Sequence, residues 1–174
     1  MNKLIRIAVT GPESTGKSLL TRQLAEHFQA PWVPEFARDY IDQLNRHYKE
    51  EDILAIARGQ LAREDSAAGR ADRVLFCDTE LIVTKIWSEV KYGRCHPWIL
   101  EQIEERPYDL YLLCYIDIPW EEDPQREHPH MRERLFTLYY EELMERGYPF
   151  GVVKGLGDDR KRNALEVIRN YFDI

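Results

Sequence analysis

The stretch that most constrains the fold runs from Leu4 to Thr21 and combines an apolar run, a glycine-rich loop and a helical pattern. The apolar run ends at Val9 and has the length of a buried strand. Residues 11–18 read GPESTGKS and match the phosphate-binding pattern G-x-x-x-x-G-K-[ST] at every defined position. The alternative is an ordinary glycine-rich turn with a serine N-cap, but strand, loop and helix together favour a P-loop, or Walker A motif.

A P-loop is built to bind a polyphosphate such as that of ATP. Its backbone N–H groups form an anion-binding nest, and the following helix adds its positive N-terminal end. Lys17 is expected to reach the β- and γ-phosphates, and the Ser18 hydroxyl is expected to ligate Mg²⁺. The expected nucleotide contacts in this stretch are Gly11, Glu13, Ser14, Thr15, Gly16, Lys17, Ser18 and Leu19.

Composition narrows the class of protein. The 174 residues suggest one domain, residues 1–174, and the net charge of −7 without a basic run argues against a nucleic-acid partner. No apolar run approaches the ~18 residues of a membrane span, and the early first strand leaves no room for a signal peptide. The cysteines (Cys77, Cys95, Cys114) lack metal-site spacing, and Cys77 and Cys114, inside apolar runs, are expected to be reduced core residues, which favours the cytoplasm.

Short apolar runs alternate with helical patterns along the rest of the chain. Such alternation predicts an α/β fold with a parallel sheet covered by helices on both faces. The expected strands are a short one before Glu35 and residues 74–77, 110–116 and 150–153; the expected later helices are residues 48–65, 81–92, 98–105, 132–146 and 163–172. Ligands bind at the carboxyl ends of parallel strands, so the residues after each strand are the candidate site.

Two aspartates follow buried strands and are candidates to work with the P-loop. Asp78 comes directly after its strand, and is expected either to hold Mg²⁺ through water or to act as general base toward a substrate hydroxyl. The alternative for Asp78 is a helix N-cap. Asp117, in the sequence IDIPW, is expected to shape its loop rather than to contact a ligand.

A polar, proline-containing segment, residues 120–134, is expected to form a lid. It carries Arg126, Arg132 and Arg134, and lid arginines can neutralise charge that develops on a transferred phosphoryl group. Arg126 is the preferred candidate. The alternative is a solvated loop whose arginines pair with neighbouring glutamates, and the two histidines, His128 and His130, lack the further ligands of a metal site.

Other candidates flank these groups. Glu35 and Arg38 follow the second strand, where a phosphate acceptor would bind, although a structural salt bridge is an equal alternative. Trp87 is a candidate to stack on a flat ring, against an ordinary packing role. Arg160 lies where an adenine-binding loop is expected and is a candidate contact for the base.

Several of these segments together resemble a known family, the ribosylnicotinamide kinase domain of the NadR-type NAD-biosynthesis proteins. The resemblance rests on GPESTGKS, PEFARDY, FCDTE, YDLYLLCYIDIPWEEDPQR and GLGDDR, and extends from Lys3 to the last helix. It implies a three-layer P-loop nucleoside-kinase fold with five parallel strands in the order 2-3-1-4-5. It also implies transfer of the ATP γ-phosphate to the 5′-hydroxyl of nicotinamide riboside, which gives the mononucleotide.

Carried over by position, the resemblance assigns ATP and Mg²⁺ binding to Gly16, Lys17 and Ser18. Asp78 becomes the acidic catalytic residue, Glu35 and Arg38 face the acceptor, and Arg126 belongs to the lid. The alternatives are a P-loop ATPase or switch module and a kinase of another nucleoside. A GTPase switch is disfavoured because the chain has no N-K-x-D base-recognition motif.

Overall fold

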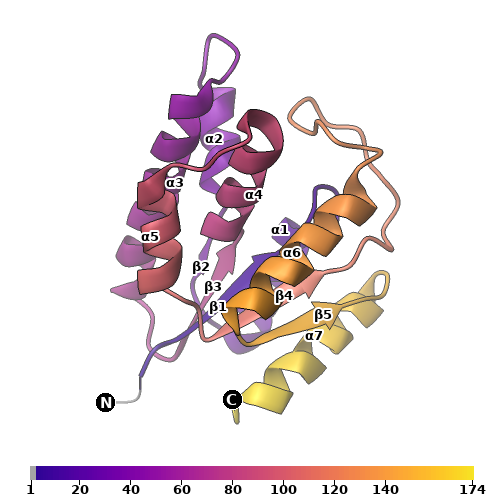
Figure 1. The fold of residues 1–174 in the computed structure, drawn as a ribbon. Coiled ribbons are helices and arrows are strands. Elements are labelled where there is room, and N and C mark those ends of the chain that lie inside the picture. Colours follow the sequence, from indigo (N-terminus) through magenta and orange to yellow (C-terminus); the bar gives the residue numbers. More distant parts are fainter. Residues whose placement is uncertain (1–2) are drawn as a thin grey trace.

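A five-stranded parallel sheet forms the centre of the computed structural model, which describes residues 3–174 (Figure 1). The strand order is β2-β3-β1-β4-β5, which confirms the predicted order. The strands are β1 (Ile5–Thr10), β2 (Trp32–Val33), β3 (Val74–Asp78), β4 (Leu110–Cys114) and β5 (Phe150–Val153). The helices are α1 (Lys17–Phe28), α2 (Phe36–Asp42), α3 (Glu50–Ala68), α4 (Leu81–Tyr92), α5 (Pro97–Glu105), α6 (Arg132–Arg146) and α7 (Asp158–Tyr171).

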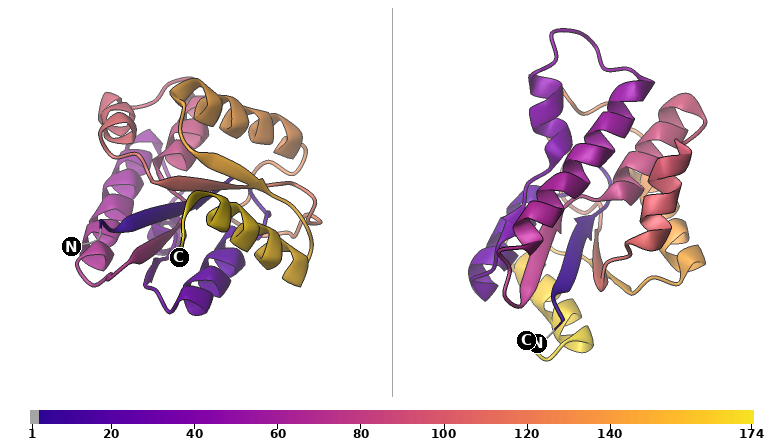
Figure 2. Two further views of the ribbon diagram at one scale, coloured as in Figure 1. Left: turned by 90° about the horizontal axis from the view of Figure 1, so that it is seen from below. Right: turned by 90° about the vertical axis from the view of Figure 1, so that its left-hand side faces the viewer.

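Helices cover both faces of the sheet, as the alternating pattern predicts. Successive strand residues point to opposite faces: Ile7 and Val9 pack in a cluster with α1 and α7, whereas Ala8 packs with α3, α4, α5 and α6. Figure 2 shows these two layers on either side of the strands. Because β3 and β4 are buried on both faces, they read as nearly continuous apolar runs, VLFCD and LYLLC, rather than as alternating sequences.

Two helices differ from the sequence-based expectation. Helix α2 was not predicted, because none of its residues is buried and it has no apolar periodicity to read. It packs on α3 through Phe36, whose ring lies where a Cβ on Gly59 would stand. Helix α7 begins at Asp158 rather than at residue 163, because its first turn is polar and two aspartates favour a helix N-terminus there.

Smaller differences concern the ends of strands and helices. The strand predicted over 110–116 ends at Cys114, and the helix predicted over 48–65 spans Glu50–Ala68. Cys77 and Cys114 are buried and free, as expected. The first two residues of the predicted domain lie outside the described residues. Within residues 3–174, no helix combines the length and the apolar character needed to cross a membrane.

The sheet topology brings the candidate residues to one edge. Strand β3 pairs directly with β1, with Val9 opposite Asp78, so the end of β3 lies beside the start of the glycine-rich loop. The loop leaves β1 through Gly11, at a φ of 131°. A Cβ at Gly11 would stand 2.9 Å from the backbone oxygen of Cys114, so only glycine lets the loop pass the end of β4 this closely.

Candidate active site

The glycine-rich loop, the predicted phosphate-binding segment, connects β1 to α1. The backbone φ is positive at Ser14, 55°, and at Gly16, 74°. Turns of this kind can direct backbone N–H groups into an anion-binding nest. The Lys17 ammonium donates a 2.6 Å hydrogen bond to the Pro12 carbonyl oxygen, and the Thr15 hydroxyl donates to the same oxygen at 2.8 Å. The loop therefore holds its lysine folded over its own backbone. Leu19 is 53% exposed, and its contact with a nucleotide stays a prediction.

Ser18 and Asp78 form the closest link between the loop and a neighbouring strand. The Ser18 hydroxyl donates a 2.5 Å hydrogen bond to Asp78 Oδ2. Asp78 is buried, and its other oxygen, Oδ1, has no hydrogen-bond partner. A buried, unpartnered carboxylate oxygen beside a hydroxyl is a donor set that suits a hard cation such as Mg²⁺. Burial raises the pKa of Asp78, opposed by the Ser18 hydrogen bond and the charge of Lys17.

Glu35 lies directly before α2 and faces the same region. Its pKa is raised, first by burial and then by the negative charge of Asp78, while the positive charges of Lys17 and Arg38 oppose the increase. The two carboxylates therefore lie close enough to disfavour ionisation of both together. Arg38, on α2, donates a 2.9 Å hydrogen bond to Asp123 in the predicted lid segment.

The segment between β4 and α6, which contains the predicted lid, contacts the glycine-rich loop (Figure 1). Its backbone N–H groups at Glu127 and His128 donate to the Glu13 carboxylate at 3.2 and 3.0 Å. Arg126 donates to the Ser14 hydroxyl at 3.3 Å, and the N–H of Glu121 donates to the same hydroxyl at 2.9 Å. Glu13 and Ser14 thus hold the lid, a role that their place in the motif does not reveal.

The middle of the lid segment, at Glu127, contacts helix α4. Trp87 donates from Nε1 to the Tyr48 hydroxyl at 2.9 Å, and that hydroxyl donates to Glu127 at 2.7 Å. Lys91 adds a 3.0 Å ion pair to Glu127. Burial is the main cause that raises the pKa of Tyr48 to about 12. Trp87 therefore lies where the lid meets α4, beside groups that the sequence did not single out.

Asp117, three residues before the lid segment, forms a 2.7 Å ion pair with Arg160; the arginine side chain is buried, and the aspartate side chain is 28% exposed. The Asp117 carboxylate also accepts a 2.6 Å hydrogen bond from the Gly155 N–H, which fits its expected loop-shaping role. Arg160 reaches the glycine-rich loop from its outer side, where its guanidinium donates to the Thr15 carbonyl oxygen at 2.8 Å. The predicted contact of Arg160 with the base of the nucleotide is not tested by these contacts and stays a prediction.

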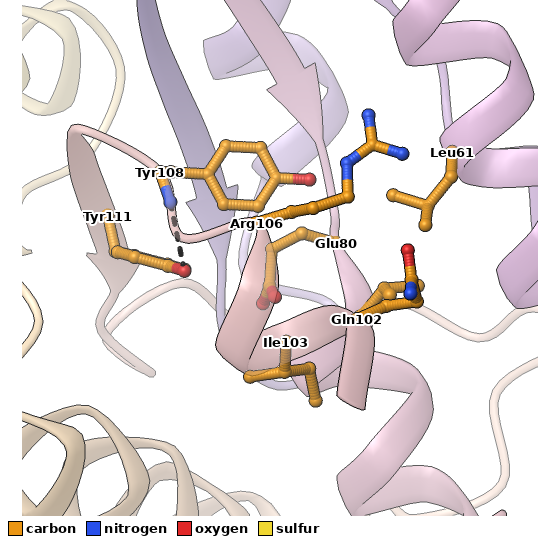
Figure 3. A pocket seen from close by; sticks show the side chains of 8 residues that line it. Leu61, Glu80, Gln102, Ile103, Arg106, Tyr108 and Tyr111 are labelled. Carbon is orange, nitrogen blue, oxygen red and sulfur yellow. Dashed lines mark hydrogen bonds between the residues drawn. The ribbon is translucent and has the colours of Figure 1, made fainter. Parts of the chain in front are cut away.

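Two hollows of the molecule lie apart from this site. A cavity of about 10 Å³ lies between Glu80, Arg106, Tyr108 and Tyr111, and has room for about one water molecule (Figure 3). A larger hollow of about 530 Å³ lies between the start of α3 and the α4–α5 connection. None of the predicted site residues lines either of them.

Glu80 is a buried acid that the sequence analysis missed as part of the site's support. Its carboxylate accepts hydrogen bonds from the Thr10 hydroxyl at 2.8 Å and from the Ile82 N–H at 2.6 Å. It therefore joins the end of β1 to the start of α4, two residues after Asp78 in the chain. The sequence could have indicated this role, because Glu80 lies two residues after Asp78 at the start of a helix, where its side chain can act as an N-cap.

Comparison with known proteins places the chain in a family. A family model described as an AAA domain matches residues 6–160, which is most of the chain. The chain belongs to this AAA-domain family. The glycine-rich loop, the lid segment and Arg160 all fall within the matched residues.

Two curated relatives share the chain's sequence more specifically. The "Trifunctional NAD biosynthesis/regulator protein NadR" of Salmonella typhimurium and that of Escherichia coli are each 30% identical over 172 residues, or 94% of this chain. Both matches span 42% of the relative, so the chain covers less than half the length of these proteins. The predicted resemblance to NadR-type proteins is confirmed.

Solved structures agree on the fold. A NadR protein crystallised in complex with NR superposes with a TM-score of 0.82 at 22% identity, over 98% of this chain and 51% of that one. Thymidylate kinase from Ehrlichia chaffeensis superposes with a TM-score of 0.69 at 15% identity, over 97% of this chain and 99% of that one. The chain therefore has the three-layer fold of P-loop kinases.

Proposed function

We propose that this chain transfers the γ-phosphoryl group of ATP to the 5′-hydroxyl of nicotinamide riboside. The observation that carries the proposal is the 2.5 Å contact between Ser18 and Asp78, which places a buried carboxylate at the phosphate-binding loop. Relatedness to NadR proteins over 94% of the chain supports the choice of acceptor. NadR structures in complex with NR, and with NAD and AMP-PNP, lend further support to a riboside acceptor and an ATP donor.

Each residue of the site has a role in this reaction. The amides of the loop and Lys17 bind the β- and γ-phosphates. Ser18 would hold Mg²⁺, with Asp78 bound to the ion through water so that its carboxylate stays available for a proton; the ion when bound neutralises charge on the phosphate oxygens. In the transfer, the 5′-oxygen forms a bond to the γ-phosphorus as the bond from phosphorus to the bridging oxygen breaks. The hydroxyl proton passes to the Asp78 carboxylate, and ADP leaves with the bridging oxygen.

Residues of the lid and of α2 complete the site. Arg126 lies above Ser14 of the loop, within reach of charge that develops on the transferred group. Glu35 and Arg38 face the phosphate acceptor. The Glu35 carboxylate can accept hydrogen bonds from the hydroxyl groups of its ribose. Trp87, from α4, packs against the acceptor ring. Closure of the lid excludes water, which would otherwise compete with the 5′-hydroxyl.

Acceptor-dependent ADP formation tests the proposal. The purified chain, ATP and Mg²⁺ are combined with nicotinamide riboside, with thymidine or deoxyadenosine, or with the 5′-deoxy analogue of nicotinamide riboside, which keeps the ring and lacks the hydroxyl. ADP and phosphorylated riboside should appear in equal amounts with nicotinamide riboside and not with the analogue. Lys17→Ala is the control for a contaminating kinase and should abolish turnover.

The alternatives predict different results in the same assay. A kinase of another nucleoside would prefer thymidine or deoxyadenosine, and an ATPase or switch module would release ADP at one rate whatever riboside is present. Either result would overturn the proposed acceptor. The proposed substrates are intracellular metabolites, so a cytoplasmic location accompanies the proposal.

A further inference from the structure

The outer side of the glycine-rich loop is held by a buried arginine. The Arg160 guanidinium donates to the Thr15 carbonyl oxygen at 2.8 Å and to the Tyr115 carbonyl oxygen at 2.7 Å. Its other terminal nitrogen donates to the Gly155 carbonyl oxygen at 2.9 Å and to Asp117 at 2.7 Å. Arg160 is only 4% exposed. One side chain thus connects the loop to the end of β4 and to the connection before α7.

A second arginine holds the preceding peptide unit. Arg132, the first residue of α6, donates to the Ser14 carbonyl oxygen at 2.9 Å and to the Ile118 carbonyl oxygen at 2.8 Å. The carbonyl groups of Ser14 and Thr15 are consecutive along the chain. Each of them therefore accepts a hydrogen bond from a cationic side chain on the side of the loop away from the phosphate-binding N–H groups.

This arrangement bears on how well the loop binds an anion. The carbonyl of Thr15 and the N–H of Gly16 belong to the same peptide unit. A charged donor on the carbonyl polarises that unit and strengthens its N–H as a donor, because linked hydrogen bonds reinforce one another. The same bonds hold the loop where Ser14 and Gly16 have positive φ values, conformations that persist only when their surroundings fix them.

We infer that Arg160 is a positioning residue that prepares the P-loop for the triphosphate from behind, with Arg132 holding the adjacent peptide, and that it does not contact the base. The inference rests on the proposed function only in requiring a polyphosphate ligand. It differs from the sequence-based assignment of Arg160, because a base contact and a loop-positioning role predict different responses to a ligand that has no base.

The test compares ATP with inorganic tripolyphosphate, each in the presence of Mg²⁺, by titration calorimetry on the full chain. Arg160→Lys keeps the charge near Asp117 and loses the forked geometry, so both ligands should bind about 10-fold more weakly, by the same factor. Arg162→Lys is the matched control. Arg162 lies on the same helix with a side chain that is 64% exposed, and its substitution should change either affinity less than about 2-fold.

Two results would overturn the inference. Weaker binding of ATP with unchanged binding of tripolyphosphate would assign Arg160 to the base, and unchanged binding of both would leave it no role in the site. If Arg160→Lys does not fold, the double variant Arg160→Gln with Asp117→Asn replaces the ion pair by neutral groups, and the same comparison applies. The readout needs no acceptor, so failure of the nicotinamide riboside assay would leave this result unaffected.

Discussion

Ser18 Oγ lies 2.5 Å from Asp78 Oδ2, although 60 residues separate the two in the sequence. Ser18 belongs to the first turn of α1, and Asp78 is the last residue of β3. The two meet because β3 pairs beside β1, which brings Asp78 level with Val9 at the start of the loop. This pairing of a loop hydroxyl with a buried carboxylate is the structural basis of the proposed phosphoryl transfer.

Asp78→Asn should separate nucleotide binding from transfer. Asparagine has nearly the same shape but cannot accept the hydroxyl proton, so we expect kcat to fall by about 100-fold or more. The affinity for ATP should change by only a few-fold, because the loop amides and Lys17 remain. Steady-state kinetics and calorimetry measure the two quantities. Asp72→Asn, an exposed aspartate in the connection before β3, is the control, and an unaltered kcat for Asp78→Asn would remove Asp78 from catalysis.

Arg126→Ala tests the lid. The Arg126 side chain donates hydrogen bonds to the Ser14 hydroxyl and to the Glu121 carbonyl oxygen, and we expect it to turn toward the phosphates when ATP binds. Loss of its charge should lower kcat by about 10- to 100-fold while the KM for ATP changes little, because charge that develops in the transition state loses its partner. Arg134→Ala, at an exposed position on α6, should leave both constants within about 2-fold. Equal effects of the two substitutions would contradict a lid role for Arg126.

Gly59→Ala tests how α3 positions the acceptor side. A Cβ at Gly59 would stand 2.1 Å from the Phe36 ring, so the first residue of α2 must move, and Glu35 with it. We expect a loss of about 1–3 kcal/mol in the free energy of unfolding, by overpacking. We also expect a KM for the acceptor that rises more than the KM for ATP.

Gly69→Ala supplies the control for this glycine. Gly69 ends the same helix at a φ of −65°, and the nearest atom to its added Cβ would be 3.7 Å away. Alanine fits there without strain, so stability should change by only a few tenths of a kcal/mol. Unchanged acceptor kinetics in Gly59→Ala would show that α2 does not position the acceptor.

Glu80 should make stability fall as pH rises. Burial raises its pKa from 4.5 to about 7, so between these values the folded chain holds a proton that the unfolded chain has released. Stability from this group is complete below pH 4.5 and is lost as pH approaches 7, by about 3 kcal/mol in total. Glu80→Gln removes the titration and keeps an oxygen acceptor for Thr10.

Urea unfolding at pH 5 and pH 8 measures this effect. The stability of Glu80→Gln relative to the unsubstituted chain should rise between these values by roughly 2–3 kcal/mol. Glu101→Gln, at an exposed position on α5, should show no such change. A difference between Glu80→Gln and the unsubstituted chain that does not vary with pH would contradict the buried, proton-bound state of Glu80.

The meeting of the glycine-rich loop with Asp78 was predictable, because it follows from local sequence pattern. Lys17 and Ser18 lie in a motif, and Asp78 ends an apolar run, so strand ends and loop chemistry suffice to bring them together. The ends of a long helix with a clear apolar pattern were also predictable: α6 was expected to span Arg132 to Arg146, as it does.

Contacts between distant segments were not predictable from pattern. Helix α2 depends on the fit of Phe36 against Gly59, which no periodicity encodes. Glu13 binds backbone N–H groups of a lid more than 110 residues away, and any exposed segment could have supplied these. Arg160 was expected to face a ligand, yet four protein oxygens accept its hydrogen bonds.

The most direct test of the proposed reaction is the ratio of ADP formed with nicotinamide riboside to ADP formed with its 5′-deoxy analogue, at equal ATP and Mg²⁺. The proposed transfer predicts a large ratio, with one phosphorylated riboside for every ADP and with no turnover in Lys17→Ala. A ratio near one, with ADP released and no riboside phosphorylated, would contradict it.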